Sequence, residues 1–301
     1  MEQTKKVQIR GGFSDRTQTQ VLNTTIQLKH LDQRTKNKLL NMINDFYMPL
    51  SKLGYKKYIF RHIIDDAFGD YISPEIEFDI DHNSNDMFKK YIYDPIMNNS
   101  YDEALSLVEY IIALFNNIAE IYVQNQPTSI NYFPNYAEEI NRLFTDEFVG
   151  YRIIDGLITP ITDEIEIKTI TEGLDIKFEG CKSHLRKSLK LLSDRDFPDY
   201  NNSIKESISA VESICKIIAN DDNATLKIAL NKIESNGTKL HIALKEAFLK
   251  LYGYTSDEDG IRHANGMTDN NARFEEAKFM LVSCCAFVNY LISLYGSIRC
   301  N

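Results

Sequence analysis

Long apolar runs and a secretory leader are both missing from this sequence. The longest uninterrupted apolar run lies around Tyr110–Phe115 and is far too short to span a bilayer. The first ten residues, MEQTKKVQIR, carry two lysines with no apolar segment after them, which is not the pattern of a secretory signal. We therefore expect a cytoplasmic protein with no membrane partner.

Cysteine and histidine do not have the spacing of metal sites. The five cysteines form no C-x-x-C pair, and Cys284 and Cys285 lie on an apolar helical stretch that favours small buried side chains. The six histidines are scattered along the chain. We expect reduced structural thiols, no metal and no cofactor.

Three glycine-rich catalytic motifs are also absent. The chain contains no G-x-x-x-x-G-K-[ST], no G-x-G-x-x-G and no G-x-S-x-G, which disfavours nucleotide hydrolysis, dinucleotide binding and an α/β-hydrolase site. The formal net charge of −9 argues against a protein that coats nucleic acid generally. It still allows a nuclease with a local basic surface.

What the sequence does contain is helical periodicity. Apolar residues recur at helical spacing over Thr35–Leu50 and Tyr101–Val123, and Ser100 with Glu103 has the pattern of a capping box. A further helix is expected within Ala137–Phe148. The segment Tyr151–Ile161 differs, because two β-prone runs flank Asp155–Gly156, a residue pair typical of a tight hairpin turn.

The second half of the chain is helical throughout. Its length of 301 residues is about twice that of a usual domain, so two domains are expected, with a boundary near the hairpin. We predict a mainly α fold whose C-terminal half is a helical bundle. The helices are expected at Glu164–Phe178, at Ser183–Leu192, after an Asn202 cap, around Leu226–Ile233 and Leu240–Leu251, and from Asn270 or Asn271 onward.

The connection before the last helix, Thr255–Gly266, reads TSDEDGIRHANG and places Arg262 beside His263. Arginine can hold a phosphate with its bidentate fork, and histidine can move a proton near neutral pH, so the pair suits phosphodiester cleavage. The alternative is a structural pair neutralised by Asp257 and Asp259. The two adjacent residues alone do not decide between these interpretations.

Four cations form a basic strip in the expected helix after residue 179: Lys182, Arg186, Lys187 and Lys190. Three of them recur every four residues, so they share one helical face and can follow a phosphate backbone. The alternative is an ordinary solvated face above apolar Leu185 and Leu189. The strip is our candidate RNA-binding surface.

Three stretches of the C-terminal half resemble the HEPN domain of AbiJ-like abortive-infection proteins: NSIKESISAVESICK (Asn202–Lys216), LHIALKEAFLKLYGYTSDEDGIRHA (Leu240–Ala264) and FEEAKFMLVSCCAFVNYL (Phe274–Leu291). Phe13–Arg16, Ile26–Gln27 and Asn37–Asn41 resemble the N-terminal domain of the same group. The resemblance implies an AbiJ-type helical domain of sensing or regulatory role over residues 1–148, a β-hairpin connector over 149–163, and a HEPN-like bundle over 164–301.

This resemblance implies an anti-phage effector that acts as a toxin by cleaving cellular RNA, such as tRNA or mRNA, without a metal. The motif arginine corresponds to Arg262 and its polar neighbour to His263, while Glu212 corresponds to an acidic residue facing the motif. The distal histidine of the family has no counterpart, so His263 or Asp269 takes its acid/base role, or the module binds RNA or protein without cleaving. The implied partners are RNA, a second copy bound through the HEPN domain, and a companion defence protein or phage trigger.

Overall fold

The structure is a computed structural model that describes residues 26–126, 132–194, 197–235, 241–256 and 272–299. It is mainly α, with a single two-stranded antiparallel sheet in the described part of the chain, which confirms the predicted fold class. The chain divides into two compact units, Met1–Pro160 and Ile161–Asn301. We describe each unit by itself.

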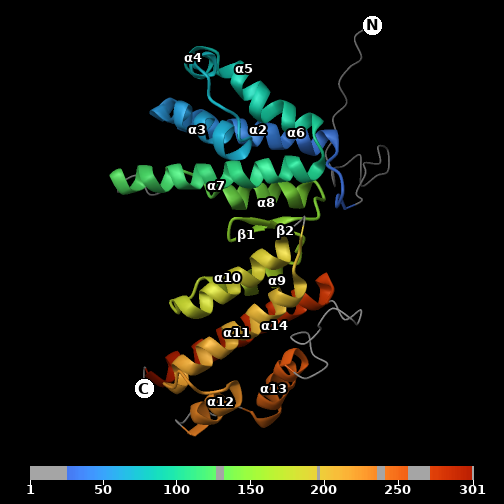
Figure 1. Ribbon diagram of the computed structural model, residues 1–301, viewed down its shortest axis with the longest axis vertical. Helices are drawn as coiled ribbons and strands as arrows, with labels where there is room; N and C mark the ends of the chain where they lie inside the picture. Colours follow the sequence, from blue (N-terminus) through green and yellow to red (C-terminus); the bar gives the residue numbers. More distant parts are fainter. Residues whose placement is uncertain (1–25, 127–131, 195–196, 236–240, 257–271, 300–301) are drawn as a thin grey trace. The chain divides into compact units, whose positions relative to one another are not determined.

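The first unit is a set of helices arranged around α7, with α2, α6 and α8 in contact with it (Figure 1). Two of its helical segments, η2 and η3, have π-helical hydrogen bonding, whereas η1 is a kink between helices at Gly54, whose φ is 93°. The bounds are α2 Gln33–Leu50, η1 Ser51–Tyr55, α3 Lys56–His62, η2 Ile63–Ala67, α4 Pro74–His82, α5 Ser84–Phe88, η3 Lys89–Tyr93, α6 Asp94–Asn98, α7 Tyr101–Asn125 and α8 Tyr136–Asp146.

Capping residues explain where the two longest helices of this unit begin. The Asp32 carboxylate accepts a hydrogen bond from the Thr35 backbone N–H at 2.8 Å, which satisfies a free donor at the start of α2. At the start of α7, Ser100 and Glu103 form the predicted capping box. Both helices then bury an apolar stripe in the core of the unit.

The hairpin also forms as predicted, from β1 (Arg152–Ile154) and β2 (Leu157–Thr159). Asp155 and Gly156 have φ values of 48° and 83°, the left-handed conformations that a two-residue turn requires. The side chains of Ile153 and Ile158 are buried in the core of the first unit. The hairpin is therefore covered on one face by this unit.

The second unit is a helical bundle in which α11 lies between α10 and α14, with α9 packed on α14 (Figure 1). The bounds are α9 Glu164–Leu174, α10 Glu179–Ser193, α11 Tyr200–Ala219, α12 Leu226–Ser235, α13 Ile242–Ser256 and α14 Phe274–Arg299. Two expected helix starts were wrong. Asp199, whose carboxylate accepts from the Asn202 N–H at 3.0 Å, caps α11 in place of Asn202, and α14 begins at Phe274 instead of Asn270 or Asn271.

Cysteines contribute to the core of this bundle. The four in the described part of the chain, Cys181, Cys215, Cys284 and Cys285, are all free thiols and all buried. Burial raises the pKa of Cys181 to about 12, so its reactive thiolate is scarce at neutral pH. Their burial agrees with the predicted structural role, and the reduced state stays a prediction.

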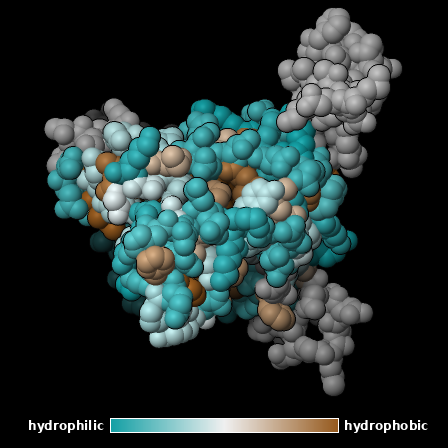
Figure 2. All heavy atoms as spheres, turned by 90° about the horizontal axis from the view of Figure 1, so that it is seen from above, coloured by the Kyte–Doolittle hydropathy of each residue, from teal (hydrophilic) through white to brown (hydrophobic). Residues whose placement is uncertain are grey.

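Two helices are long and apolar enough to cross a membrane by length and composition, α7 and the Phe274–Tyr295 part of α14. About half of the most apolar window of each is buried inside the protein, 50% and 44%, as is usual for core helices. Figure 2 shows hydrophilic side chains over most of the face it presents, with apolar groups in small separate patches.

Candidate functional site

The predicted catalytic loop runs from the end of α13 to the start of α14. Arg262, His263 and Asp269 lie outside the described residues, so their geometry is not part of the structure. The residues after the loop are anchored on α11: the Ala272 N–H donates to the Asn201 Oδ1 at 2.9 Å. The Tyr200 and Phe274 rings also meet edge to face, with centroids 6.2 Å apart. The end of the loop is therefore fixed at the start of α11.

Glu212, the predicted acidic partner, lies on α11 and is partly buried. Among the described residues its carboxylate makes no hydrogen bond or ion pair. Its negative charge contributes, after burial and Cys181, to raising the pKa of Cys215. Glu212 is thus a half-buried carboxylate on the same helix that anchors the end of the loop.

The basic strip lies on α10, but its members differ in their contacts. Arg186 and Lys190 are exposed and Lys182 is partly buried. Lys187 instead points to α11, where its Nζ lies 2.5 Å from the Glu206 Oε1. The helical face is therefore formed by Lys182, Arg186 and Lys190, while Lys187 takes part in helix packing.

Glu206 is the centre of a polar cluster that the sequence did not suggest. The carboxylate is 11% exposed and contacts both Lys187 and His184, whose Nδ1 lies 2.7 Å from the Glu206 Oε2. Burial acts to raise the pKa of Glu206, but the hydrogen bonds from Lys187 and His184 outweigh it and the pKa is lowered. The group is held as a carboxylate between α10 and α11.

Next to this cluster, three buried serines join the same two helices. The Ser188 Oγ lies 3.0 Å from the Ser203 Oγ and 2.7 Å from the Ser207 Oγ. Ser203 and Ser207 also donate to the backbone carbonyls of Ser188 and Ser203. Small hydroxyl side chains allow close helix packing and satisfy one another, so we interpret this part of the interface as structural.

We expect Glu206→Gln to destabilise the second unit by about 1–2 kcal/mol, because an amide cannot replace the charged carboxylate that pairs with Lys187 and hydrogen-bonds His184. The expected loss of stability is modest because the His184 and Lys187 side chains are 41% and 62% exposed and remain partly solvated. Urea unfolding followed by circular dichroism measures the change. Glu172→Gln, at an exposed carboxylate 3.9 Å from Lys168, is the matched control. Equal stability of the two variants would contradict the assignment.

A second charged cluster lies in the first unit, at the end of α8. The Glu147 side chain is fully buried, and the Arg34 Nε and Nη2 donate to its two oxygens at 2.8 and 3.1 Å. Lys38 makes a further ion pair with it. Burial acts to raise the pKa of Glu147, but the hydrogen bonds from Arg34 and Lys38 outweigh it and the pKa is lowered.

Gln27 ties the start of the described chain to this cluster. Its Nε2 donates to the Glu147 carbonyl at 2.6 Å, and its backbone pairs with Phe148 and Gly150 in a parallel bridge. Residues more than a hundred positions apart thus meet at one point. No spacing in the sequence could reveal this contact.

A model of the AbiJ N-terminal domain 4 family matches residues 11–176. This is more than half of the 301-residue chain. The protein belongs to the AbiJ N-terminal domain 4 family. No curated protein and no solved structure matches it.

The AbiJ family match covers the described first unit and extends through α9 of the second. The Glu147 cluster, the hairpin and their helices therefore all belong to the AbiJ domain. Membership places the chain in an abortive-infection family and confirms the N-terminal part of the predicted resemblance. The residues after 176, which include Glu206, Glu212 and the basic strip, lie beyond the match.

Proposed function

We propose that this protein is an anti-phage abortive-infection effector whose second unit is a HEPN-type, metal-independent endoribonuclease. The abortive-infection role follows from the AbiJ domain. The ribonuclease role rests on Arg262 and His263 in the connection between α13 and α14, together with the free carboxylate of Glu212 on α11.

The lengths of chain involved allow Arg262 to reach Glu212. Glu212 lies eleven residues along α11 from Asn201, or about 16 Å at 1.5 Å per residue. Arg262 is ten residues before Ala272, which Asn201 anchors, and six residues after the end of α13. Ten extended residues span roughly 33 Å, more than the distance from Asn201 to Glu212, so the Ala272 end does not prevent the contact.

Each residue then has a chemical role. Arg262 binds the scissile phosphate and stabilises the charge that develops on it, and Glu212 orients the guanidinium. His263 moves the proton of the attacking 2′-hydroxyl or of the leaving oxygen. Asp269 is the second candidate for the acid/base role. A homodimer that pairs two such loops would supply both sides of one site.

Lys182, Arg186 and Lys190 are the residues we propose to bind the RNA backbone. They lie on one face of α10, and cations at this spacing neutralise successive phosphates. Lys187 is a weaker candidate than the sequence suggested, because it is bound to Glu206.

The alternative function is a non-catalytic module that binds RNA or a companion defence protein. The net charge of −9 and the absence of a histidine at Met267–Asp269 favour it. In that case Arg262 contributes to binding, and the wild-type chain leaves RNA intact.

Expression in bacteria under phage challenge tests the ribonuclease. We expect wild-type cells to stop growing with degraded RNA after infection, and Arg262→Ala/His263→Ala cells to keep intact RNA and release phage. Arg273→Ala is the matched control, since Arg273 is 78% exposed and its ion pair is with Glu276, three residues further along the chain. If the double variant behaves as wild type in growth and in RNA integrity, the proposed site is wrong.

A further inference from the structure

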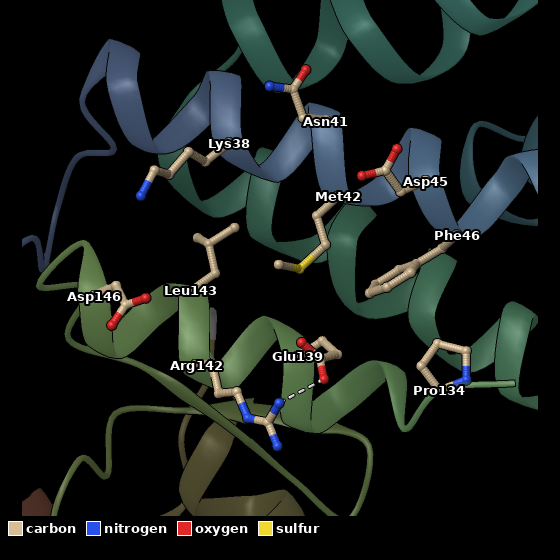
Figure 3. Close-up of a pocket in the computed structure, with 10 residues that line it drawn as sticks. All are labelled: Lys38, Asn41, Met42, Asp45, Phe46, Pro134, Glu139, Arg142, Leu143 and Asp146. Atoms are coloured by element: carbon tan, nitrogen blue, oxygen red, sulfur yellow. Dashed lines mark hydrogen bonds and ion pairs between the residues drawn. The ribbon is translucent and has the colours of Figure 1, made fainter. Parts of the chain in front are cut away.

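The first unit contains an open groove between α2 and α8, with a volume of about 570 Å³ (Figure 3). Met42, Phe46, Leu143 and Pro134 form its apolar part, and the rest of the lining is polar or charged. The volume is in the range of small-ligand and peptide-side-chain sites. Phe46 and Leu143 are themselves buried, so the apolar part is fixed by the core of the unit.

The charged residues of the groove fall into two classes. Its two cations are already paired: Lys38 with Glu147, and Arg142 with Glu139, whose Oε1 lies 2.8 Å from the Arg142 Nη1. Asp45 and Asp146 are exposed carboxylates that make no ion pair or hydrogen bond with any described residue. The unsatisfied charge of the groove is therefore negative.

These two carboxylates lie at opposite ends of the groove. Figure 3 shows Asp146 at the Lys38 end and Asp45 at the Phe46 end, with Met42 and Leu143 between them. Lys38 and Asp45 are seven residues apart on α2, so the α2 wall between these two ends is roughly 10 Å long. Asp146 is also the last residue of α8, where the carbonyl end of a helix adds partial negative charge.

An anionic occupant would have to displace Glu147 or Glu139 from its cation, whereas a cationic occupant meets two carboxylates that are free to receive it. Apolar side chains between the carboxylates favour an occupant with a bulky apolar group at its centre. About three extended residues match the roughly 10 Å length of the α2 wall. The groove thus specifies positive charge at both ends of its occupant and an apolar group in the middle.

We propose that the α2/α8 groove of the AbiJ domain binds a short peptide segment of a partner protein, in which two basic side chains flank a bulky apolar one. The basic groups pair with Asp45 and Asp146, and the apolar group packs on Met42 and Leu143. The site lies entirely within the first unit and does not depend on the ribonuclease proposed for the second.

Isothermal titration calorimetry of the full chain tests this proposal with blocked four-residue peptides. The probe has arginine at both ends and leucine followed by phenylalanine in the middle. We expect saturable binding that weakens with added salt, as exposed ion pairs do. Binding should be lost when the terminal arginines are replaced by glutamates, and about tenfold weaker when the two central residues are alanine.

The decisive variant is Asp45→Asn/Asp146→Asn, which removes both charges and keeps the side-chain shapes. We expect about tenfold weaker binding of the arginine peptide, the loss of two exposed ion pairs. Glu120→Gln/Glu138→Gln, two exposed carboxylates outside the groove, should bind as wild type. Thermal melting of both double variants checks that each is folded.

Three results would overturn the proposal. They are failure of the arginine peptide to saturate the wild-type chain, equal binding of that peptide to the Asp45→Asn/Asp146→Asn variant, and binding of the glutamate peptide as tight as that of the arginine peptide. If no peptide binds and the same variant changes the sedimentation coefficient of the chain, the groove is occupied by a second copy and the peptide proposal fails.

Discussion

Replacing Glu147 by glutamine is expected to lower the free energy of unfolding of the first unit by about 2–4 kcal/mol. Glutamine has nearly the same shape, but it leaves Arg34 and Lys38 facing a buried neutral amide. The loss falls below the upper range for fully buried pairs, because the Arg34 and Lys38 side chains are 23% and 41% exposed and solvent compensates them in part. Urea unfolding of the full chain measures the difference.

The same variant has a specific pH dependence. The pKa of Glu147 is lowered in the folded protein, while a glutamate in the unfolded chain titrates near about 4.3. The stabilisation is therefore complete above the unfolded pKa and is lost as the pH falls through the folded pKa. We expect the stability gap between wild type and Glu147→Gln to be constant above about pH 5 and to shrink in more acidic solution.

Two controls separate the buried cluster from general charge effects. Glu120→Gln, at an exposed position on α7, should leave stability within about 0.5 kcal/mol of wild type at every pH. The double variant Lys38→Gln/Glu147→Gln should lose less than the sum of its single variants, since the two side chains are in contact. A pH-independent gap, or strict additivity, would show that the ion pairs are not the cause.

The elements that could be predicted from the sequence are those set by neighbours in the chain. The Asp155–Gly156 turn and the Ser100–Glu103 capping box each need only a few adjacent residues, and both form as predicted. The start of α11 was misassigned for the same local reason: Asp199 and Asn202 are both good caps, and Pro198 does not distinguish them.

The charged clusters could not be predicted, because their members come from distant parts of the chain. Glu147 lies 113 residues from Arg34, and Glu206 lies 19 residues from Lys187 on another helix. Periodicity indicates which face of α10 each lysine occupies. It does not indicate which carboxylate a neighbouring helix brings to that face, and so Lys187 looked like a free cation. The α2/α8 groove was missed for the same reason.

The largest expected effect concerns the proposed ribonuclease. For the full chain purified from phage-infected cells, we expect Arg262→Ala to reduce the rate of RNA cleavage by about 100- to 1000-fold. This is the usual effect of removing one group that stabilises developing charge. Arg262→Lys should recover only part of the rate, because lysine keeps the charge but lacks the bidentate fork. Gel analysis of end-labelled RNA measures both rates.

His263 and Asp269 can be separated in the same assay. The residue that moves the proton should lose about 100-fold or more when replaced by His263→Ala or Asp269→Asn, and its loss should also remove one limb of the pH–rate profile. The other variant and Arg273→Ala should cleave as wild type does. A chelator should leave the rate unchanged if the chemistry is metal-independent.

RNA binding measured beside cleavage distinguishes the two proposed functions. A ribonuclease loses turnover in Arg262→Ala while still binding RNA through Lys182, Arg186 and Lys190. A binding module has no wild-type cleavage to lose, and Arg262→Ala weakens its RNA affinity instead. If Arg262→Ala cleaves and binds RNA as the wild type does but melts at a lower temperature, Arg262 is the counter-charge of Asp257 or Asp259. The site then belongs elsewhere.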